Sequence, residues 1–307
     1  MKGEFFKEIL CTYIPGSIYC GIEILYNGKE FFDNINVDEY FEYRAGCDMD
    51  EHRLRRCLRD EGAQVMLECH ESLDSTNIRA AELCKEGRTD ALVVSEEQIK
   101  GRGRRGRSFC SPKACGAYFS ILLRIKLSKE SFGLISLAGA NAVHSGITSV
   151  TGRDVEIKWI NDIFFKKRKV GGIMVEALGE ISSGKEVPVV IGIGINCVDS
   201  PEVSRLDIDA GALSIAEDMR EALIAKITKN VMDLKKGCNV EDVIGNYKKH
   251  CMTLGSDITV YEDAEKRMPV YTAKATDIAD TGELVVKTEA GELRLLNSCE
   301  VSTGLSL

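Results

Sequence analysis

A basic, glycine-rich segment is the part of this sequence best suited to bind a ligand. Residues 100–107 read Lys-Gly-Arg-Gly-Arg-Arg-Gly-Arg, so five of the eight side chains are cationic and the rest are glycine. Glycine lets backbone N–H groups approach a ligand closely, and arginine offers a planar fork of donors that fits carboxylate and phosphate. The segment therefore predicts a loop that binds a small anionic compound. A solvated basic loop or a nucleic-acid patch remains an alternative.

The same segment matches the GxGxxG pattern of dinucleotide-binding folds, from Gly101 to Gly106. That pattern requires a helix that opens at the third glycine and an acidic residue about 20 positions further on. Here Ser111 and Pro112 follow the glycines, and residues 121–126 read Ile-Leu-Leu-Arg-Ile-Lys. Since neither condition is met, the sequence argues against a dinucleotide-binding fold.

Four further motifs accompany the loop, and together with it they resemble the biotin protein ligase family. In chain order the set is Asp74-Ser-Thr-Asn77, the loop with Gln98 before it, Lys158-Trp-Ile-Asn-Asp162, Lys169-Val-Gly-Gly-Ile-Met-Val-Glu176 and Gly192-Ile-Gly-Ile-Asn196. They follow the family's order and spacing over residues 50–303. The resemblance implies an enzyme that activates biotin with ATP and attaches it to a lysine of a carrier protein.

The resemblance also implies roles for single residues. Ser75, Thr76 and Gln98 are similar to the groups around biotin's ureido ring, which needs both donors and acceptors. The residues expected to be catalytic are Lys169, Arg104 and Asp162. The set expected to bind biotin is Ser75, Thr76, Asn77, Gln98, Gly101, Arg102, Gly103, Arg104, Lys169, Gly172, Gly192 and Gly194. The set expected to bind ATP is Arg104, Arg107, Phe109, Asn161, Lys169 and Asn196.

Several of these residues also have ordinary structural explanations. Ser75 suits a helix N-cap, Asn161-Asp162 suits a turn, and Gly171-Gly172 suits a bulge. Lys169 follows three basic residues, 166–168, so an exposed basic turn would explain it without any chemistry.

Three positions depart from the family pattern. Phe109 stands where tryptophan is common, Ile160 where proline is common, and Cys197 where an aliphatic residue is frequent. The first departure predicts a weaker or different stacking surface for the adenylate. The N-terminal sequence does not resemble the winged helix-turn-helix of repressor-type members, so DNA binding is not expected.

Composition narrows the class of protein. The formal charge of −8 and the pI near 5.3 argue against general nucleic-acid binding. The most apolar stretch, Val187–Ile195, is too short to span a bilayer, and the start of the chain lacks the apolar centre of a signal peptide. The twelve cysteines contain no CxxC pair, and only four histidines are present, so neither a zinc site nor a disulfide framework is expected. We expect a cytoplasmic protein.

The predicted elements place the motifs in an α+β fold: a mixed-sheet catalytic domain with packed helices, followed by a small SH3-like β domain. Residues 1–45 form an N-terminal extension of unknown role, 46–252 the catalytic domain and 253–307 the β domain. In the extension, Ile18–Leu25 reads as a strand, Asn27-Gly28 as a hairpin turn and Phe31-Phe32 as the start of the return strand. Helices are expected over Met49–Glu61, from Asp74-Ser75 to about Lys85, and over Phe132–Val150, Ala216–Lys235 and Val240–His250. Strands are expected over Val65–Glu68, Ala91–Ser95, Ala117–Ile125, Val155–Trp159, Ile163–Phe165, Val170–Ala177, Val187–Ile195 and four short runs after Leu254.

The expected substrates are ATP and biotin, with Mg²⁺ as the metal and a biotin carboxyl carrier protein, of acetyl-CoA carboxylase or a related carboxylase, as the partner. No membrane partner is expected, and a homodimer is compatible with the sequence. The nearest alternative is a lipoate–protein ligase-like acyltransferase. An octanoyl transferase would need a nucleophilic cysteine, for which Cys110 and Cys115 are the candidates. A nucleic-acid-binding regulator without enzyme activity is the alternative from another class.

Overall fold

The computed structural model describes residues 9–14, 17–22, 25–26, 29–30, 49–128, 131–181, 185–206, 209–237, 239–261, 269–297 and 300–303. The chain divides into two compact units, Met1–Ala45 and Gly46–Leu307. In the first unit β1 (Ile9–Ile14) pairs antiparallel with β2 (Ser17–Ile22), and β3 (Leu25–Tyr26) pairs with β4 (Lys29–Glu30). The expected turn at Asn27-Gly28 and the expected return strand at Phe31-Phe32 lie outside the described residues.

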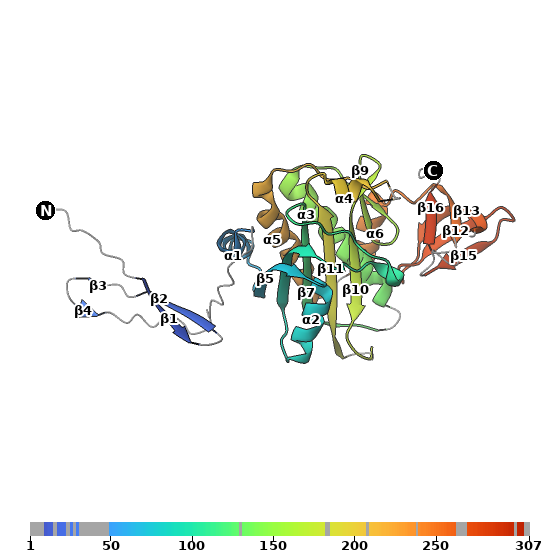
Figure 1. Cartoon of the computed structure of the whole chain (residues 1–307). Coiled ribbons are helices and arrows are strands. Elements are labelled where there is room, and N and C mark those ends of the chain that lie inside the picture. Colours follow the sequence, from blue (N-terminus) through green and yellow to red (C-terminus); the bar gives the residue numbers. More distant parts are fainter. Residues whose placement is uncertain are drawn as a thin grey trace. The chain divides into compact units, whose positions relative to one another are not determined.

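The second unit is built on a seven-stranded mixed sheet with the order β5-β6-β7-β11-β10-β9-β8 (Figure 1). Only β5 and β6 run parallel, and every other neighbouring pair in this sheet is antiparallel. The strands are β5 (Met66–Leu73), β6 (Ala91–Gln98), β7 (Gly116–Lys126), β8 (Glu156–Lys158), β9 (Asp162–Phe165), β10 (Arg168–Ala177) and β11 (Glu186–Asn196). A strand was expected over Val65–Glu68. The observed strand β5 begins at Met66 and continues through polar residues to Leu73.

Helices cover both faces of this sheet. Leu122 of β7 packs in a small core with Ala80 and Leu83, whereas its neighbours Ile121 and Leu123 belong to the large core on the other face. This alternation follows from the two-residue period of a strand. The helices are α1 (Glu51–Asp60), α2 (Thr76–Lys85), α3 (Phe132–Thr151), α4 (Pro201–Ser204), α5 (Arg220–Met232) and α6 (Val240–His250), and α2 alone among them contributes to the small core. The helix expected over 216–235 is present over 217–236, with α5 at its centre and a short 3₁₀ turn continuing it at each end.

A five-stranded antiparallel sheet follows α6, with the order β15-β14-β13-β12-β16. Its strands are β12 (Asp257–Tyr261), β13 (Pro269–Ile278), β14 (Leu284–Thr288), β15 (Leu293–Leu296) and β16 (Glu300–Thr303). The domain boundary expected at residue 252 falls between the end of α6 and the start of β12. The α+β class expected from the sequence is confirmed.

Trp159 joins the two sheets. Its backbone N–H donates to Thr253 Oγ1 at 2.9 Å, and its indole Nε1–H donates to the carbonyl oxygen of Gly282 at 3.2 Å. The side chain is 5 % exposed, so Trp159 belongs to the core. Among the described residues, no helix is both long enough and apolar enough to cross a bilayer.

Candidate functional site

The start of α2 carries a buried polar network. The backbone N–H and the hydroxyl of Thr76 both donate to Gln98 Oε1, at 3.0 and 3.1 Å, and Gln98 Nε2 donates to Ser111 Oγ at 2.9 Å. Ser120 of β7 lies below this network, with its hydroxyl 2.7 Å from Thr76 Oγ1 and 2.6 Å from Asn77 Oδ1. The network combines hydroxyl and amide groups, so it can both donate to and accept from a flat polar ligand.

Ser75 precedes this network and is 3 % exposed. It occupies the N-cap position of α2, but its side chain makes no capping hydrogen bond. The N-cap interpretation is thus right for the position and wrong for the hydroxyl.

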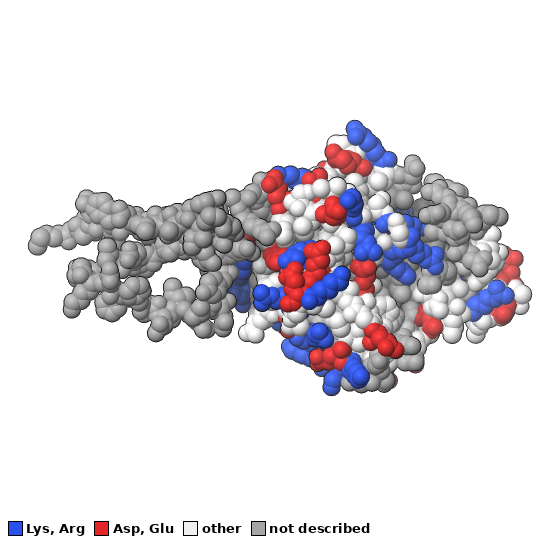
Figure 2. Space-filling model, turned by 60° about the horizontal axis from the view of Figure 1, so that its bottom comes forward, with Lys and Arg blue, Asp and Glu red and all other residues white. Residues whose placement is uncertain are grey.

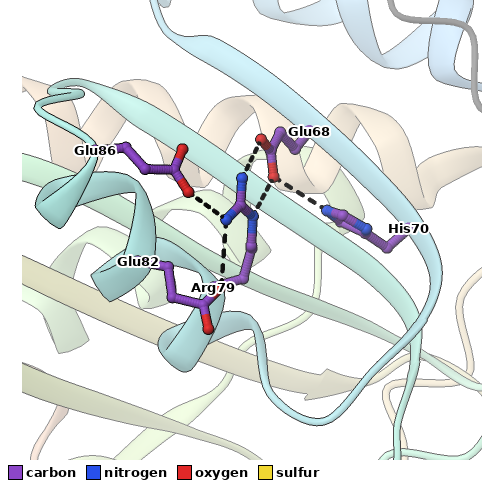
Figure 3. A network of polar contacts seen from close by, with 5 residues as sticks. All are labelled: Glu68, His70, Arg79, Glu82 and Glu86. Atoms are coloured by element: carbon purple, nitrogen blue, oxygen red, sulfur yellow. Dashed lines mark hydrogen bonds and ion pairs between the residues drawn. The ribbon is translucent and has the colours of Figure 1, made fainter. Parts of the chain in front are cut away.

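A charged network holds α2 against the edge strand β5 (Figure 3). The Arg79 guanidinium forms two contacts to Glu68 of β5, at 2.9 and 3.0 Å, and also contacts Glu82 and Glu86 of its own helix. His70 Nε2 lies 3.1 Å from the same Glu68 carboxylate. The hydrogen bond to His70, together with those from Arg79, lowers the pKa of Glu68 to about 2 although burial opposes this. The network fixes the helix whose first residues build the polar site.

The glycine-arginine loop folds back on itself beside this site. The backbone N–H of Gly103 donates to the Arg107 carbonyl at 2.7 Å, and Phe109 N–H donates to the Gly101 carbonyl at 2.8 Å. A Cβ on Gly101 would lie 2.2 Å from the Phe109 carbonyl oxygen, so this close approach requires glycine. Arg105 adopts a positive φ of 57° and, like Arg107, is exposed. The backbone hydrogen bonds thus shape the loop from within, while these cations face outward.

Two arginines of the loop reach other elements of the site. Arg104 Nη1 donates to Asn161 Oδ1 at 3.1 Å, and Arg102 lies 3.4 Å from the Glu176 carboxylate. Asn161 is in turn fixed by its Nδ2, which donates to the Ile173 carbonyl at 2.7 Å. The loop is therefore connected to the β8–β9 turn and to β10.

An ion pair lies on the β9–β10 hairpin. Lys169 Nζ is 2.7 Å from Asp162 Oδ1, and the two side chains are 26 % and 29 % exposed. Lys166 and Lys167 form the exposed turn of this hairpin, with φ of 49° and 66°. The expectation of a basic turn thus applies to those two lysines, whereas Lys169 lies on β10. The expected turn at Asn161 and the bulge beside Gly171 are both present.

A row of glycines on β10 and β11 forms one surface between these groups. Gly172 pairs with Gly194, and a Cβ on Gly172 would lie 3.5 Å from Asp162 Oδ1. A Cβ on Gly192 would lie 1.9 Å from Asn77 Oδ1, and one on Gly194 would lie 2.4 Å from the Phe109 ring. Gly192 and Gly194 therefore make room for the protein side chains of Asn77 and Phe109.

Phe109 and Asn196 lie at the far end of this row. The Phe109 ring contacts Tyr118 edge to face, with centroids 6.4 Å apart. Asn196 is 7 % exposed, and its Nδ2 donates to the Gly211 carbonyl at 2.9 Å. Its Oδ1 is buried and has no hydrogen-bond partner within the described part of the chain. A buried acceptor of this kind suits an N–H group of a ligand.

The structure brings most of the predicted site residues together through these contacts, and it adds three that the sequence reasoning missed. Ser111 and Ser120 complete the Gln98 and Thr76 hydrogen bonds, and Glu176 accepts from Asn77 Nδ2 at 2.7 Å. Ser120 interrupts the apolar strand Ala117–Ile125, which was the signal available in the sequence. Glu176 is the last residue of the Lys169–Glu176 motif, and nothing in the sequence indicated its contact with Asn77.

The thiols of Cys110 and Cys115 and the distribution of surface charge bear on two alternative functions, an octanoyl transferase and a nucleic-acid-binding regulator. Burial raises the pKa of Cys110 and of Cys115, which disfavours the thiolate that an acyl transferase would need. On the face drawn in Figure 2, basic and acidic side chains are interspersed and do not form one continuous basic surface. Neither observation favours an octanoyl transferase or a nucleic-acid interface on that face.

Known proteins share both the sequence pattern and the fold. Residues 70–196 match the biotin/lipoate A/B protein ligase family, and residues 264–304 match the biotin protein ligase C terminal domain. The bifunctional ligase/repressor BirA of Bacillus subtilis is 28% identical over 265 residues, which cover 83% of this chain and 79% of the relative. The biotin–[acetyl-CoA-carboxylase] ligase of Paracoccus denitrificans is 33% identical over 137 residues, covering 44% of this chain and 55% of the relative. The structure of the biotin protein ligase from Aquifex aeolicus, in complex with biotin and ATP, has a TM-score of 0.61 at 23% identity and covers 78% of this chain and 99% of its own.

Proposed function

The chain belongs to the biotin protein ligase family, and we propose that the site around Thr76, Arg104 and Lys169 performs both half-reactions of such a ligase. The protein is an ATP-dependent biotin ligase. The observation that carries the assignment of the site is its geometry: a neutral polar network at the start of α2 and a cationic group on β10 lie at opposite ends of one glycine-lined strand surface. A ligand with a cyclic urea at one end and a carboxylate at the other matches this distribution.

In the first half-reaction, a carboxylate oxygen of biotin attacks the α-phosphorus of ATP and pyrophosphate leaves, which gives biotinyl-5′-AMP. Both reactants are anionic, so catalysis depends on neutralising charge and on positioning. Lys169 and Arg104 are suited to this work, because Asp162 and Asn161 hold them at 2.7 and 3.1 Å. The reaction needs no nucleophilic side chain.

The biotin end rests on Thr76, Gln98 and Ser111, with Ser75 and Asn77 beside them and the backbone of residues 101–103 above. A cyclic urea presents one acceptor and two donors, and hydroxyl and amide side chains can satisfy both. Gly192 and Gly194 give room to the side chains of Asn77 and Phe109, and at Gly172 the atom nearest to an added Cβ is 3.5 Å away.

The nucleotide end is assigned to Phe109, Asn196 and Arg107. Phe109 offers a ring face for the adenine, and the buried Asn196 Oδ1 offers an acceptor for its N–H groups. Arg107 is exposed at the rim, where it can meet the phosphates.

Asp162 is the carboxylate at the phosphate end of the site. Among the described residues, no three acidic, histidine or cysteine side chains converge as a metal cage. Mg²⁺ is commonly held by one or two carboxylates together with substrate phosphates, and Asp162 fits that mode of binding. The ion would neutralise phosphate charge there.

In the second half-reaction, the amine of a carrier lysine attacks the acyl carbon of the mixed anhydride and AMP leaves. The acceptor that we propose is a biotin carboxyl carrier protein of acetyl-CoA carboxylase or a related carboxylase. A homodimer and a cytoplasmic location stay predictions.

The deciding experiment is biotin-dependent ATP–pyrophosphate exchange on the purified protein. Biotin should stimulate exchange, while lipoate and octanoate should not, because those acyl chains carry no ureido group to pair with the polar network at Thr76. Exchange with lipoate alone would reject the biotin assignment and favour the lipoate ligase alternative.

A further inference from the structure

Glu176 lies where the glycine-arginine loop meets the start of α2. Its Oε2 accepts a hydrogen bond from Asn77 Nδ2 at 2.7 Å, and its Oε1 lies 3.4 Å from the Arg102 guanidinium. One carboxylate therefore contacts a site residue with one oxygen and the loop with the other. The Glu176 side chain is 27 % exposed and that of Arg102 is 46 % exposed, so the contact lies at the edge of the site.

The placement of Glu176 follows from the strand register. Gly172, Met174 and Glu176 alternate along β10, and Glu176 pairs with Val190, which packs beneath α2. The carboxylate thus projects from the same face of the sheet that bears the site. Lys169, which pairs with Asp162, lies seven residues earlier in the chain, near the other end of β10.

The loop has separate attachments at its base and towards its tip. At the base, the backbone N–H groups of Ile99 and Lys100 donate to the carbonyls of Leu73 and Asp74, at 2.8 and 2.9 Å. Beyond the base, Arg102 and Arg104 make the side-chain contacts that cross to other elements. The Arg104 contact belongs to the phosphate end. At the biotin end, Lys100 Nζ pairs with Asp74 at 2.9 Å at the base of the loop, and the Arg102–Glu176 contact attaches the part of the loop beyond the base.

We propose that Glu176 is a positioning residue that latches the glycine-arginine loop against Asn77 and so retains biotinyl-5′-AMP until the carrier lysine arrives. This rests on the proposed function of the site. The adenylate hydrolyses when water reaches it, so a loop that opens early releases it without product. Because Glu176 lies away from Lys169, its loss should change retention of the intermediate more than the rate at which it forms.

The test uses Glu176→Gln and a matched control, Glu186→Gln, which removes the same charge from an exposed position on β11. The amide introduced by Glu176→Gln can still accept from Asn77 but no longer attracts Arg102. The first measurement needs neither biotin nor ATP: trypsin cleavage after Arg105 and Arg107 in the full chain, followed by mass spectrometry. We expect cleavage about two- to fivefold faster in Glu176→Gln, the effect of losing one partly exposed ion pair, and no change in the control.

The second measurement is the escape of preformed biotinyl-5′-AMP from the enzyme, beside single-turnover formation of the same compound. Glu176→Gln should speed escape by about two- to fivefold and slow formation by a smaller factor than that. Arg102→Gln should speed escape equally, and the double variant should add nothing, since one contact is lost in each case. Wild-type cleavage rates in Glu176→Gln, equal acceleration in Glu186→Gln, or fully additive effects would each overturn the latch. A wild-type protein that forms no adenylate would instead reject the proposed function, and the cleavage experiment would still decide the latch.

Discussion

Lys169 and Asp162 form an ion pair 2.7 Å long on adjacent strands, and Lys169 closely follows two lysines that are exposed in a turn. We propose that Lys169 neutralises the carboxylate of biotin and the α-phosphate of ATP. In that case Lys169→Ala should slow adenylate formation by ~10²–10³, equivalent to about 3–4 kcal/mol. Single-turnover formation of biotinyl-5′-AMP at saturating biotin and ATP measures this, with thermal melting as the folding control.

Lys166→Ala and Lys167→Ala remove the same charge from the turn and serve as matched controls. Each should stay near the wild-type rate and within about 0.5 kcal/mol in stability. A Lys169→Ala enzyme that melts normally and keeps most of its rate would remove Lys169 from the mechanism. Equal losses of rate in all three variants would indicate that the combined positive charge of residues 166–169 matters, and not a specific contact of Lys169.

Gly192→Ala tests the position of Asn77. The new methyl group would lie 1.9 Å from Asn77 Oδ1, and Asn77 is held by Ser120 and Glu176, so the amide must move and lose these contacts. We expect biotin to bind about 10- to 100-fold more weakly by calorimetry, as the loss of one or two buried hydrogen bonds implies. Gly245→Ala in α6 is the control: nothing lies within 4 Å of its Cβ, so it should gain up to about 1 kcal/mol in stability and bind biotin normally. Unchanged biotin affinity in Gly192→Ala would contradict this account of Asn77.

Glu96 and Arg220 form a buried bidentate pair, at 2.9 and 3.0 Å, between β6 and the first residue of α5. Their side chains are 0 % and 5 % exposed. Glu96→Gln should lower the free energy of unfolding by about 3–5 kcal/mol, because it leaves a buried guanidinium without its charge partner. The double variant Glu96→Leu/Arg220→Met should lose much less free energy of unfolding than the single variants Glu96→Leu and Arg220→Met lose together. Urea denaturation of the double variant and of each single variant measures this, and additive losses would show that the pair is not coupled.

The Glu68 network predicts a pH dependence of stability. The pKa of this carboxyl is lowered from 4.5 to about 2 by His70 and Arg79, so its stabilising contribution is present above pH 4.5 and is lost as the pH falls towards 2. Glu68→Gln should therefore reduce the free energy of unfolding by about 1–2 kcal/mol at pH 7, after allowance for solvent screening. Urea titrations at pH 7, 5 and 3 should show the difference between variant and wild type shrinking at the lowest pH. A difference that stays constant across this range would contradict the lowered pKa.

DNA binding is expected to be absent, although a relative carries the name ligase/repressor. The N-terminal sequence does not resemble a winged helix-turn-helix, and the elements that the structure describes in residues 1–45 are strands. Mobility-shift assays with the DNA upstream of the protein's own gene, with and without biotin and ATP, should show no sequence-specific shift. A salt-resistant and sequence-dependent shift would contradict this.

Local pattern was sufficient to predict the strands and helices that carry the site. The regular apolar periods of Phe132–Val150 and Val187–Ile195 placed α3 and β11 within one residue at each end. The long helix expected over 216–235 is present as a continuous helical span over 217–236, but sequence periodicity does not reveal that its two ends tighten into 3₁₀ turns. The loop was singled out by its glycine and arginine content, which predicts anion binding, whereas the Lys169 motif and the glycines of β10 and β11 were singled out by the resemblance to the ligase family.

Contacts between distant residues could not be predicted in the same way. The Asn77–Glu176 hydrogen bond and the stacked rings of His144 and His250, 3.8 Å apart, join residues about one hundred positions apart. Single histidines in the sequence gave no reason to pair them. Ser75 shows the converse: its type and position suit a cap, yet its hydroxyl does not serve as one.

The contacts of Trp159 set the order in which the site can be completed during synthesis. The turn that carries Asn161 is supported by Thr253 and Gly282, which follow Trp159 by 94 and 123 positions. The network of Thr76, Gln98, Ser111 and Ser120 needs only residues that leave the ribosome much earlier. Since domains emerge from the N-terminal side, a growing chain can form the Thr76 network while the turn that carries Asn161 still lacks this support. The small C-terminal sheet thus supplies, through Gly282, the last contact that supports the turn at Asn161.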